Sequence, residues 1–443
     1  MDSPRAPIWL LTLLFAALAM PAAARCAEPD LARAISQLGS DEFAERQEAT
    51  RILRAAGPDA IPQIAAALQT GDAEVRARAF GVLSEHALSS EAPRSRPARI
   101  ALAGLAGGPP GRVATSAAAA LEAVEQLLVA RLTAMRAVVG SRRATGFAPP
   151  PRGDSREDDA VPSIVSLLKA NRWYQVQINQ GWNGGDEGLA LLGELGGIGW
   201  LSAESSPLTD DSLIHIGRLT DLEQLYLGSS RVQGSGLKHL APLSNLRYLS
   251  LKQLPIDDDD LAGLPAFPEL QSFGLDLTEV GDAGLAQLAR YPRVSRLWLD
   301  GTRVTDAGLP HLKSLPELNT LYLAGTKITG PGLAELQDHA GLTYLSLKFT
   351  NFRAEGLVHV GKLKQLERLG LDNTNVTDEM LAGLTGLTRL REVWLNSTPI
   401  TDAGLVHLRG LKDLQVLHLD STEVTSEGVL ELQRAIPQLH VTR

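Results

Sequence analysis

A repeat of 24 residues constrains this chain more than any other feature of its sequence. Leucine or valine recurs at that spacing without a slip, and each member opens a Leu-x-x-Leu-x-Leu phrase such as Leu318, Leu321 and Leu323. One such segment cannot bury its leucines alone, whereas stacked copies form a continuous core. We therefore expect a solenoid in this part of the chain. The column consists of Leu222, Leu246, Leu270, Val294, Leu318, Leu342, Leu366, Leu390 and Leu414.

A second phrase follows the first in each unit, and its clearest form is Gly-Thr-Arg-Val-Thr-Asp-Ala-Gly-Leu at residues 301–309. The two phrases together resemble the leucine-rich-repeat family, and the match covers nearly all of residues 174–443. Extended backwards through Ile198 and Leu189, the frame gives about eleven repeats. The resemblance implies an α/β solenoid, with a curved parallel sheet and short outer helices. It also implies protein–protein interaction as the commonest role.

Residues 25–139 show helical rather than 24-residue periodicity. Ser40 is a natural N-cap for a helix whose apolar side is formed by Phe43 and Leu53. A second helix opens with the Asp-x-x-Val-Arg phrase of Asp72 and Val75. This paired-helix pattern resembles HEAT repeats, so we expect a small all-α HEAT-like solenoid before the leucine-rich repeats.

The two predicted solenoids are separated by residues 140–162, which contain three consecutive prolines, clustered charge and no apolar period. That composition is typical of a linker. The predicted domains are therefore 25–139 for the HEAT-like helices, 140–162 for the linker and 163–443 for the leucine-rich repeats.

Residues 1–24 are typical of a signal peptide. A 13-residue apolar run from Ile8 to Met20 follows Arg5, and Ala22 and Ala24 satisfy an Ala-x-Ala cleavage pattern. The run is short for a membrane span, which needs about 20 apolar residues. We expect export to the periplasm or the extracellular space, with no transmembrane span after signal removal. An export signal joined to both repeat types resembles bacterial envelope repeat proteins.

Composition narrows the remaining classes. A single cysteine, Cys26, excludes an intrachain disulfide and a multi-cysteine zinc site. The net charge of −9 disfavours a nucleic-acid partner. The sequence holds no Gly-x-Ser-x-Gly, His-Glu-x-x-His or Walker phrase. We therefore predict no catalytic residues, no cofactor and no enzyme, with a hydrolytic enzyme as the remote alternative.

Threonine and aspartate recur after each predicted strand, and we interpret both columns as structural. The threonines are expected to form a hydrogen-bonding ladder between neighbouring coils, which Leu254 interrupts together with the local order. Three residues further on, a second set of threonines is expected to cap helices, and the acids after them to favour the positive helix ends. The ladder set is Thr278, Thr302, Thr326, Thr350, Thr374, Thr398 and Thr422; the caps are Thr305, Thr329, Thr377 and Thr401; the acids are Asp306, Asp378 and Asp402.

Two further clusters invite a metal interpretation and do not support it. The recurrent histidines include only one pair in adjacent repeats, His215 and His239. The run from Asp257 to Asp260 lacks the alternation and the glycine of a calcium loop. We therefore predict no metal site, and a solvated helix start at the aspartate run.

Outward strand positions are the ones that the scaffold does not dictate. Between the strand leucines they repeat after four units, because Tyr226 and Tyr322 lie 96 residues apart and the neighbouring positions match in the same way. This pattern indicates a duplicated four-coil block, and hence two similar binding patches along one face. The column reads Tyr226, Ser250, Gly274, Trp298, Tyr322, Ser346, Gly370, Trp394 and His418.

These side chains suit recognition, because Tyr, Trp and Arg are the usual anchors of protein interfaces. We predict a scaffold that binds a protein or peptide on its concave face. The alternatives are a glycan ligand on the Trp and Tyr strip, or aromatic packing that only decorates the sheet. Trp173, Trp182 and Trp200 are expected to cap the core at the first coils instead. The predicted binding residues are Tyr226, Tyr248, Arg296, Trp298, Asp300, Tyr322, Tyr344, Arg368, Asp372, Trp394, Asn396 and His418.

Overall fold

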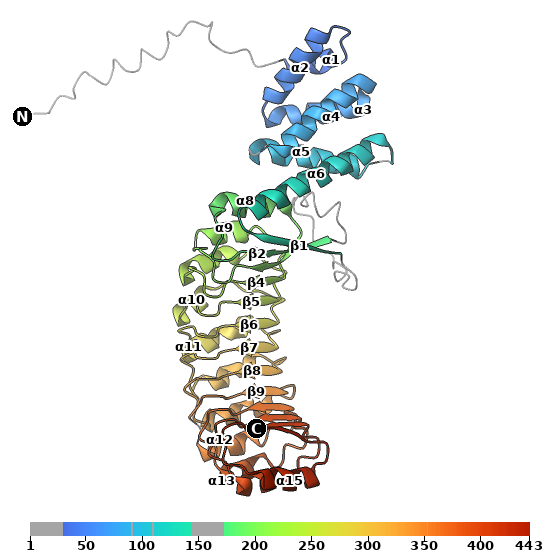
Figure 1. Ribbon diagram of the computed structural model, residues 1–443. Coiled ribbons are helices and arrows are strands. Elements are labelled where there is room, and N and C mark those ends of the chain that lie inside the picture. The colour runs from blue at the N-terminus through green and yellow to red at the C-terminus, as the bar shows by residue number, and fades with distance from the viewer. Residues whose placement is uncertain (1–29, 90–91, 109, 144–171, 352) are drawn as a thin grey trace, which may run out of the picture. The chain divides into compact units, whose positions relative to one another are not determined.

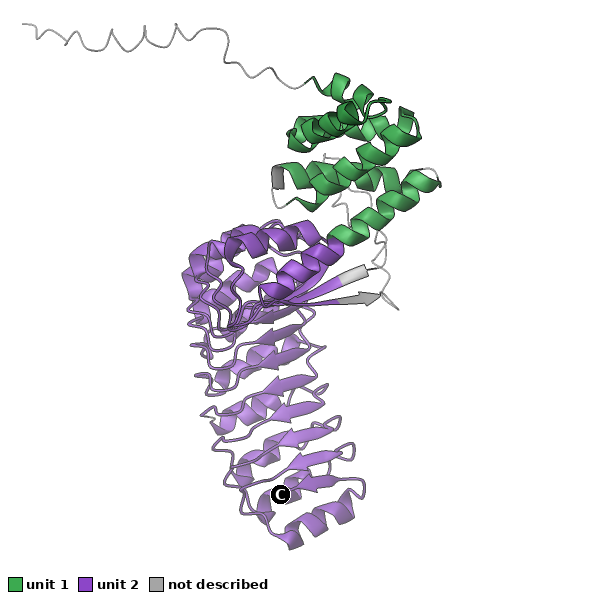
Figure 2. Cartoon of the chain, turned by 45° about the horizontal axis from the view of Figure 1, so that its top comes forward, with its two compact units in different colours: residues 1–124 green, residues 125–443 purple. Residues whose placement is uncertain are grey.

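The computed structural model describes residues 30–89, 92–108, 110–143, 172–351 and 353–443. The chain forms two compact units that meet in sequence between Val124 and Glu125 (Figure 2). The predicted signal peptide, Cys26 and residues 144–162 of the predicted linker lie outside the described residues. Export and the predicted domain limits therefore stay predictions, although residues 140–143, placed in the linker, belong to a strand.

The first unit is built from antiparallel helices, and the predicted helical repeat before the solenoid is confirmed. Its core contains Leu53, Ile64 and Leu83, which are fully buried. The N-cap residues of two of its helices can be compared with the sequence predictions. Asp72 caps its helix by accepting from the Val75 amide at 2.8 Å. The elements are α1 (Leu31–Gln37), α2 (Phe43–Ala55), η2 (Pro58–Ala60), α3 (Ile61–Thr70), α4 (Ala73–Leu88), α5 (Ala92–Ala106) and α6 (Arg112–Ala134), of which α6 continues into the second unit.

Two predictions for α2 were wrong. The helix begins at Phe43 with Glu42 as its N-cap. The Ser40 hydroxyl lies before the helix, where it accepts from the Glu42 amide at 3.1 Å and donates to the Glu45 carboxylate at 2.6 Å. Phe43 was expected on the apolar side, and its side chain is 63% exposed. A residue in the first turn lies ahead of the packed part of the helix, so helical spacing alone did not locate it.

The second unit is a leucine-rich-repeat solenoid, as the repeat predicted (Figure 1). Within the described residues it holds a sheet of thirteen strands in chain order, antiparallel between the first two and parallel thereafter. The strands are β1 (Val138–Arg143), β2 (Arg172–Gln177), β3 (Ile198–Ser202), β4 (Gln224–Tyr226), β5 (Tyr248–Ser250), β6 (Ser272–Gly274), β7 (Arg296–Trp298), β8 (Thr320–Tyr322), β9 (Tyr344–Ser346), β10 (Arg368–Gly370), β11 (Glu392–Trp394), β12 (Val416–His418) and β13 (His440–Thr442).

Short helices form the opposite side of this unit (Figure 1). They are α8 (Gly185–Leu195), α9 (Ser212–Ile216), η3 (Gly234–Leu240), α10 (Asp258–Gly263), α11 (Asp282–Leu285), η4 (Ala286–Arg290), η5 (Leu309–Ser314), η6 (Pro331–Asp338), α12 (Ala354–Val360), α13 (Asp378–Leu381), η7 (Ala382–Leu384), α14 (Asp402–Leu405), η8 (Val406–Leu408) and α15 (Ser426–Ala435). Between strands and helices lies the leucine core, in which Leu318, Leu321 and Leu323 are 0% exposed. Each buried leucine contributes about 1.5–3 kcal/mol of transfer free energy.

A left-handed residue follows the strand in ten consecutive coils and turns the chain towards the helical side. Its φ lies between 53° and 67° throughout, although glycine occupies the position only at Gly301 and Gly325. Leu277 and Phe349 hold it with exposed side chains, 53% and 63% respectively. A Cβ at Gly301 would lie 2.5 Å from Leu277 Cδ2, so the leucine packs over that glycine. The residues are Ser205, Ser229, Gln253, Leu277, Gly301, Gly325, Phe349, Asn373, Ser397 and Ser421.

The predicted threonine ladder between coils was wrong. Each hydroxyl donates within its own coil to the carbonyl three residues earlier, as Thr302 does to Leu299 at 2.6 Å. The threonine directly follows the left-handed turn, so its side chain closes that turn rather than reaching the next coil. Leu254 lacks the hydroxyl, but its amide still donates to the Leu251 carbonyl at 3.2 Å. The loss of local order expected there does not occur.

The aspartates perform the linking role instead. Asp306 accepts from the Thr329 hydroxyl at 2.7 Å and from the amides of Thr329, Gly330 and Gly332 at 2.8, 3.0 and 2.9 Å, all in the next coil. Burial opposes ionisation of Asp306, but these donors outweigh it and hold its pKa below the ordinary value. Equivalent amide bonds join Asp210 to Gln233, Asp258 to Gly281, Asp282 to Thr305, Asp378 to Thr401 and Asp402 to Thr425.

The predicted threonine caps hold only in part. Thr401 is the N-cap of α14 and accepts from the Ala403 amide at 3.2 Å, although its hydroxyl also donates to Asp378. Thr377 is the N-cap of α13 without a side-chain cap bond, and its hydroxyl donates to Glu379. Thr329 caps no helix, because Gly330 is the N-cap of η6.

One helix among the described residues, α6, is long and apolar enough to cross a membrane by length and composition, with a hydropathy of 1.4. Its buried residues Ala117, Leu121, Val124, Leu128 and Leu132 form one stripe at helical spacing. Such a stripe is typical of a helix packed on one side. The expected absence of a span after signal removal stays a prediction.

Candidate functional site

The outward positions of the strands form a sheet face opposite the helices. In each three-residue strand the middle residue points into the core and its two neighbours point outward, because side chains alternate along a strand. In β7, for example, Leu297 is buried, Trp298 is half-buried and Arg296 is exposed. Parallel pairing in register aligns these positions from coil to coil, so that Arg296 lies beside Thr320 and Trp298 beside Tyr322.

Eight rings on this face form one continuous line, which we call the aromatic strip. It runs from Trp200 on β3 to His418 on β12, and every ring contacts the next. The centroid distances are 5.6 Å for Trp200–Tyr226, 4.4 Å for Tyr226–Tyr248, 6.0 Å for Tyr248–Trp298, 5.5 Å for Trp298–Tyr322, 4.7 Å for Tyr322–Tyr344, 6.2 Å for Tyr344–Trp394 and 5.4 Å for Trp394–His418. Pairs at such distances stabilise each other by about 0.5–1.5 kcal/mol, so the strip is held rigid.

Two glycines keep the strip continuous. Tyr248 and Trp298 belong to β5 and β7, and Gly274 is the outward residue on the strand between them. Gly370 stands in the same place between Tyr344 and Trp394. Without a side chain at these positions, rings two strands apart reach each other across the gap.

Burial within the strip raises the pKa of Tyr248 to about 12 and also raises the pKa values of Tyr226 and Tyr344. Tyr344 is only 7% exposed, so it supports its neighbours more than it offers surface.

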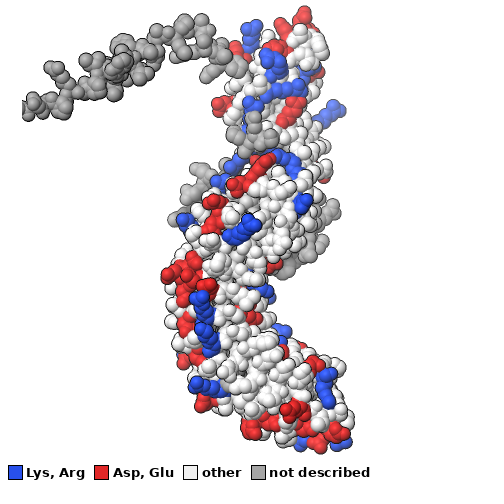
Figure 3. All heavy atoms as spheres, turned by 60° about the vertical axis from the view of Figure 1, so that its left-hand side comes forward, with Lys and Arg blue, Asp and Glu red and all other residues white. Residues whose placement is uncertain are grey.

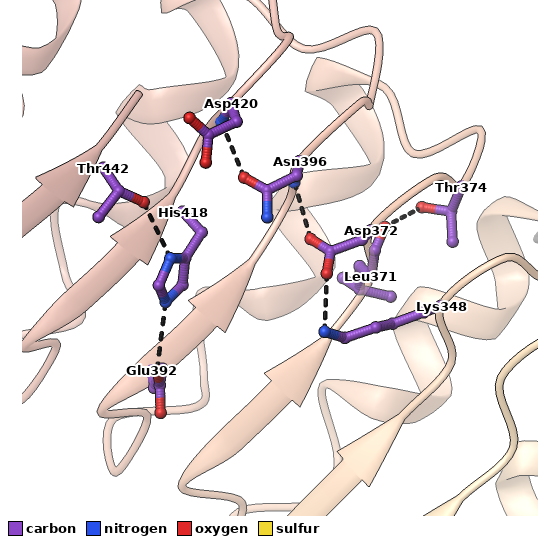
Figure 4. Close-up of polar contacts among 9 residues, drawn as sticks. All are labelled: Lys348, Leu371, Asp372, Thr374, Glu392, Asn396, His418, Asp420 and Thr442. Atoms are coloured by element: carbon purple, nitrogen blue, oxygen red, sulfur yellow. Dashed lines mark hydrogen bonds and ion pairs between the residues drawn. The ribbon is translucent and has the colours of Figure 1, made fainter.

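An ammonium group lies beside the strip at β10 and β11. Lys348 Nζ is 2.8 Å from Asp372 Oδ2 and 4.9 Å from the centroid of the Trp394 ring. Asp372 also accepts from the Asn396 amide at 2.9 Å, and Asn396 Oδ1 accepts from the Asp420 amide at 2.8 Å (Figure 4). Lys348, Asp372, Asn396 and Asp420 thus form a connected polar row along the end of the strands.

The equivalent row four coils earlier carries two carboxylates. Asp276 and Asp300 are both half-buried, and Asp300 accepts from the Ala324 amide at 2.6 Å. Burial raises the pKa of Asp276, and burial followed by the Asp276 charge raises the pKa of Asp300 to about 6. Lys252 lies near enough to lower both pKa values, but it is exposed and its side chain makes no hydrogen bond or ion pair with the described residues.

The predicted arginines and the histidine flank the strip. The Arg368 guanidinium lies 4.7 Å from the Tyr344 ring centroid, and Arg296 Nε donates to Ser272 Oγ at 3.0 Å. His418 stacks on Trp394 with an interplanar angle of 2°, and its ring nitrogens lie 2.9 Å from Thr442 Oγ1 and 3.2 Å from Glu392 Oε1 (Figure 4).

The structure places all twelve predicted binding residues on the sheet face or in the row at its edge; that they bind a partner stays a prediction. Trp200 was misplaced by sequence reasoning, because it was expected to cap the core and instead opens the strip. Its alignment with Tyr248 and Tyr344 in the strand columns could have shown this. Trp182 is buried at the first coil, with its ring against Gly184 and Gly188, as a capping role requires. The side chain of Trp173 is not among those that the structure describes.

The helical side carries ordinary solvated charge. Figure 3 shows acidic and basic side chains interspersed there, and pairs such as Arg303–Glu279 (2.8 Å) and Lys313–Glu335 (2.6 Å) join neighbouring coils. The recurrent histidines belong to this side. In the part of the chain that the structure describes, no group of three or more His, Cys, Asp or Glu residues is arranged to hold a metal ion.

Comparison with known proteins gives similarity in structure alone. No family model matches the sequence, and no curated protein matches it. Among solved structures, an internalin from Listeria monocytogenes is 18% identical with a TM-score of 0.40, over 62% of this chain and 87% of that one. A leucine-rich-repeat protein from Leptospira interrogans is 18% identical with a TM-score of 0.35, over 57% and 80%.

A third similar structure is the leucine-rich-repeat ectodomain of a plant membrane receptor kinase from Arabidopsis thaliana, solved in complex with CASPARIAN STRIP INTEGRITY FACTOR 2. It is 16% identical with a TM-score of 0.38, over 57% of this chain and 33% of that one. At such TM-scores and identities, these likenesses say nothing about what this chain binds.

Proposed function

We propose that the chain is an exported, non-enzymatic scaffold that binds a protein or peptide along the aromatic strip. The observation that carries this proposal is the continuous line of ring contacts from Trp200 to His418 on the outward side of the sheet. A solenoid needs buried leucines to fold, but it does not need rings on its solvent side. Sheet decoration alone leaves the unbroken line across two glycine coils unexplained.

The strip has the dimensions of an extended polypeptide site. Its ends lie on β3 and β12, nine strand spacings apart, which corresponds to about 43 Å along the sheet. An extended segment of about thirteen residues covers that length at 3.3 Å per residue. The rings are already held by their neighbours, so binding costs little side-chain entropy.

A glycan remains the competing ligand, and ring geometry disfavours it. Sugars stack on a free face of an aromatic ring. The Trp298 ring stacks on Tyr322 with an interplanar angle of 12°, and the Trp394 ring stacks on His418 with an angle of 2° while Lys348 occupies its surroundings. One face of each of these two rings is therefore already occupied, which leaves less ring surface for a sugar to stack on.

The first test is pull-down mass spectrometry from native envelope extract with the chain and its Trp298→Ala, Trp394→Ala variant. The matched control is Leu277→Ala with Phe349→Ala, which also removes two large exposed apolar side chains, but from the turns rather than the strip. All three proteins must show the same far-ultraviolet circular dichroism and thermal unfolding.

A partner retained by the control and lost by the tryptophan variant supports the proposal. Identical partners for all three proteins reject the strip as the binding site. A glycan array with folded protein separates the competing ligand, because a hit that depends on the two tryptophans would replace the polypeptide.

A further inference from the structure

The duplicated block allows one part of the strip to be compared with another in the same molecule. We call residues 222–317 the first copy and residues 318–413 the second copy. Five positions around the gap in the strip are identical between them. These are Tyr248 and Tyr344, Lys252 and Lys348, Gly274 and Gly370, Asp276 and Asp372, and Trp298 and Trp394.

In the second copy these positions form a seat that holds an ammonium group. The Lys348 stem crosses directly over the glycine, because a Cβ on Gly370 would lie 2.8 Å from Lys348 Cε. The head reaches Asp372 at 2.8 Å and lies over the Trp394 ring. A carboxylate and an aromatic face together are a favourable environment for a desolvated cation. The chain's own lysine therefore shows which chemistry this framework accepts.

In the first copy the lysine does not enter the same seat. A Cβ on Gly274 would lie 3.4 Å from Ser250 Oγ and 3.6 Å from Asp276 Oδ2, and Lys252 is not among its nearest neighbours. Gly274 itself is buried. Lys252 is exposed and makes no contact with Asp276 within ion-pair distance. A second carboxylate, Asp300, stands where the second copy has Asn396. The framework is retained, its internal cation is withdrawn, and one negative charge is added.

The charge of the surrounding edge favours a cationic group as well. The row of residues two positions beyond the outward strand column contains five acids and two lysines from Glu204 to Asp420. The acids are Glu204, Asp276, Asp300, Asp372 and Asp420, and the lysines are Lys252 and Lys348. Lys348 is engaged by Asp372, whereas in the first copy the single Lys252 lies near two carboxylates, which leaves one negative charge in excess in this part of the row.

We propose that a lysine or arginine side chain of the bound polypeptide docks in the first copy, with its cationic head beside Asp276, Asp300 and the half-buried ring of Trp298. This inference rests on the proposed function and names the chemistry of the partner at one position. The raised pKa values of Asp276 and Asp300 agree with it, because burial leaves both carboxylates short of solvation that a bound cation would replace.

The test is selection of a phage-displayed random 12-residue peptide library on the full chain. We expect selected peptides to be enriched in Lys and Arg over the input library. A synthetic selected peptide should bind the Asp276→Asn, Asp300→Asn variant about tenfold more weakly, as expected for loss of a charge-assisted contact. Asp413→Asn with Glu427→Gln is the charge-matched control, because both side chains are exposed and lie away from the strip.

A second variant keeps the test decisive if the double aspartate variant is unstable. Lys252→Ala removes the lysine whose charge acts on Asp276 and Asp300. Because this lysine would repel a cationic side chain, the variant should bind the same peptide more tightly. Selected peptides without basic residues, or equal binding by wild type and both variants, would overturn the inference and leave the proposed function standing. Failure to select any peptide would overturn both.

Discussion

The two copies of the four-coil block share a framework and differ in how they balance charge. In the second copy Lys348, Asp372 and Asn396 satisfy one another, and Asp372 is only 7% exposed. In the first copy Lys252 is turned to solvent, while Asp276 and Asp300 keep two partly buried negative charges side by side. The comparison shows that a scaffold with equivalent apolar core positions and identical rings supports a polar row with an ion pair and one without.

The difference also separates stability from recognition. A paired lysine and aspartate stabilise the fold and offer little to a ligand. Two crowded, partly buried carboxylates destabilise the folded state at neutral pH, because burial and mutual repulsion both oppose their ionisation. Free energies of unfolding can be followed by tryptophan fluorescence, because the tryptophans outside the predicted signal peptide are Trp173, Trp182, Trp200, Trp298 and Trp394, all in the second unit.

The largest expected effect concerns the aspartates that link coils. Asp306 and Asp402 are equivalent, yet Asp306 accepts four bonds from the next coil and Asp402 accepts two. We expect Asp306→Ala to lower the free energy of unfolding by about 2–4 kcal/mol and Asp402→Ala by about 1–2 kcal/mol, at roughly 1 kcal/mol per bond. Urea titration measures both. Equal losses would show that the number of linking bonds does not matter.

The ion pair gives the second prediction. A double-mutant cycle on Lys348→Ala and Asp372→Asn should give a coupling free energy of about 1–2 kcal/mol, because the Asp372 side chain is largely buried. The same cycle on Lys252→Ala and Asp276→Asn should give about 0–0.5 kcal/mol. A coupling in the first copy as large as that in the second would mean that Lys252 also closes its seat.

Asp300 provides a pH-dependent test. Its pKa rises from the ordinary value of 3.8 to about 6 on folding. The folded state therefore holds the proton more tightly, and the associated stability is present below about pH 4 and lost as pH rises to about 6. Asp300→Asn should stabilise the second unit by roughly 1 kcal/mol at pH 7.5, after allowance for solvent exposure, and should have almost no effect at pH 4.

Asn396→Asp supplies the matching control in the second copy, since it installs the carboxylate pair of the first copy and should destabilise at pH 7.5. Urea titrations at both pH values are the measurement. A stabilisation by Asp300→Asn that is the same at pH 4 and pH 7.5 would exclude the raised pKa as its cause.

The smallest effect is expected at the glycines. Gly274→Ala should change the free energy of unfolding by less than about 0.5 kcal/mol, because its nearest neighbour is 3.4 Å from the new methyl group. Gly370→Ala should cost slightly more and displace Lys348, whose stem lies 2.8 Å away. The displacement can be read as a weaker Lys348–Asp372 coupling in the cycle above. An undiminished coupling would show that the stem has a second path to Asp372.

The sequence predicted the solenoid because every coil must bury the same leucines at the same spacing. It also predicted which strand positions face outward, since alternation decides that. Roles set by geometry after the strand were harder to predict. Threonine and aspartate recur with equal regularity, and only the left-handed turn decides that Thr302 bonds within its coil while Asp306 reaches the next.

The candidate site was predicted as a set of residues but not as an arrangement. Trp200 was assigned to the core end because it lies in the first coils, and only strand register places it beside Gln224 and next to the Tyr226 ring. The pairing of Lys348 with Asp372, and the absence of such a pair at Lys252, also escaped prediction. Lysine and aspartate stand at both sites, so the distinction depends on side-chain conformation and on Asp300, which stands where the second copy has Asn396.

Strand order in the second unit equals chain order, so each strand pairs only with the strands directly before and after it in the chain. The number of coils in such a solenoid is therefore not fixed by the fold. Adding or removing whole coils changes one junction and leaves every other contact intact, so a solenoid can lengthen in steps that a globular domain could not survive. The match between residues 222–317 and 318–413 is the pattern that one such step would leave. That step would place a second copy of the ring positions four coils along the sheet.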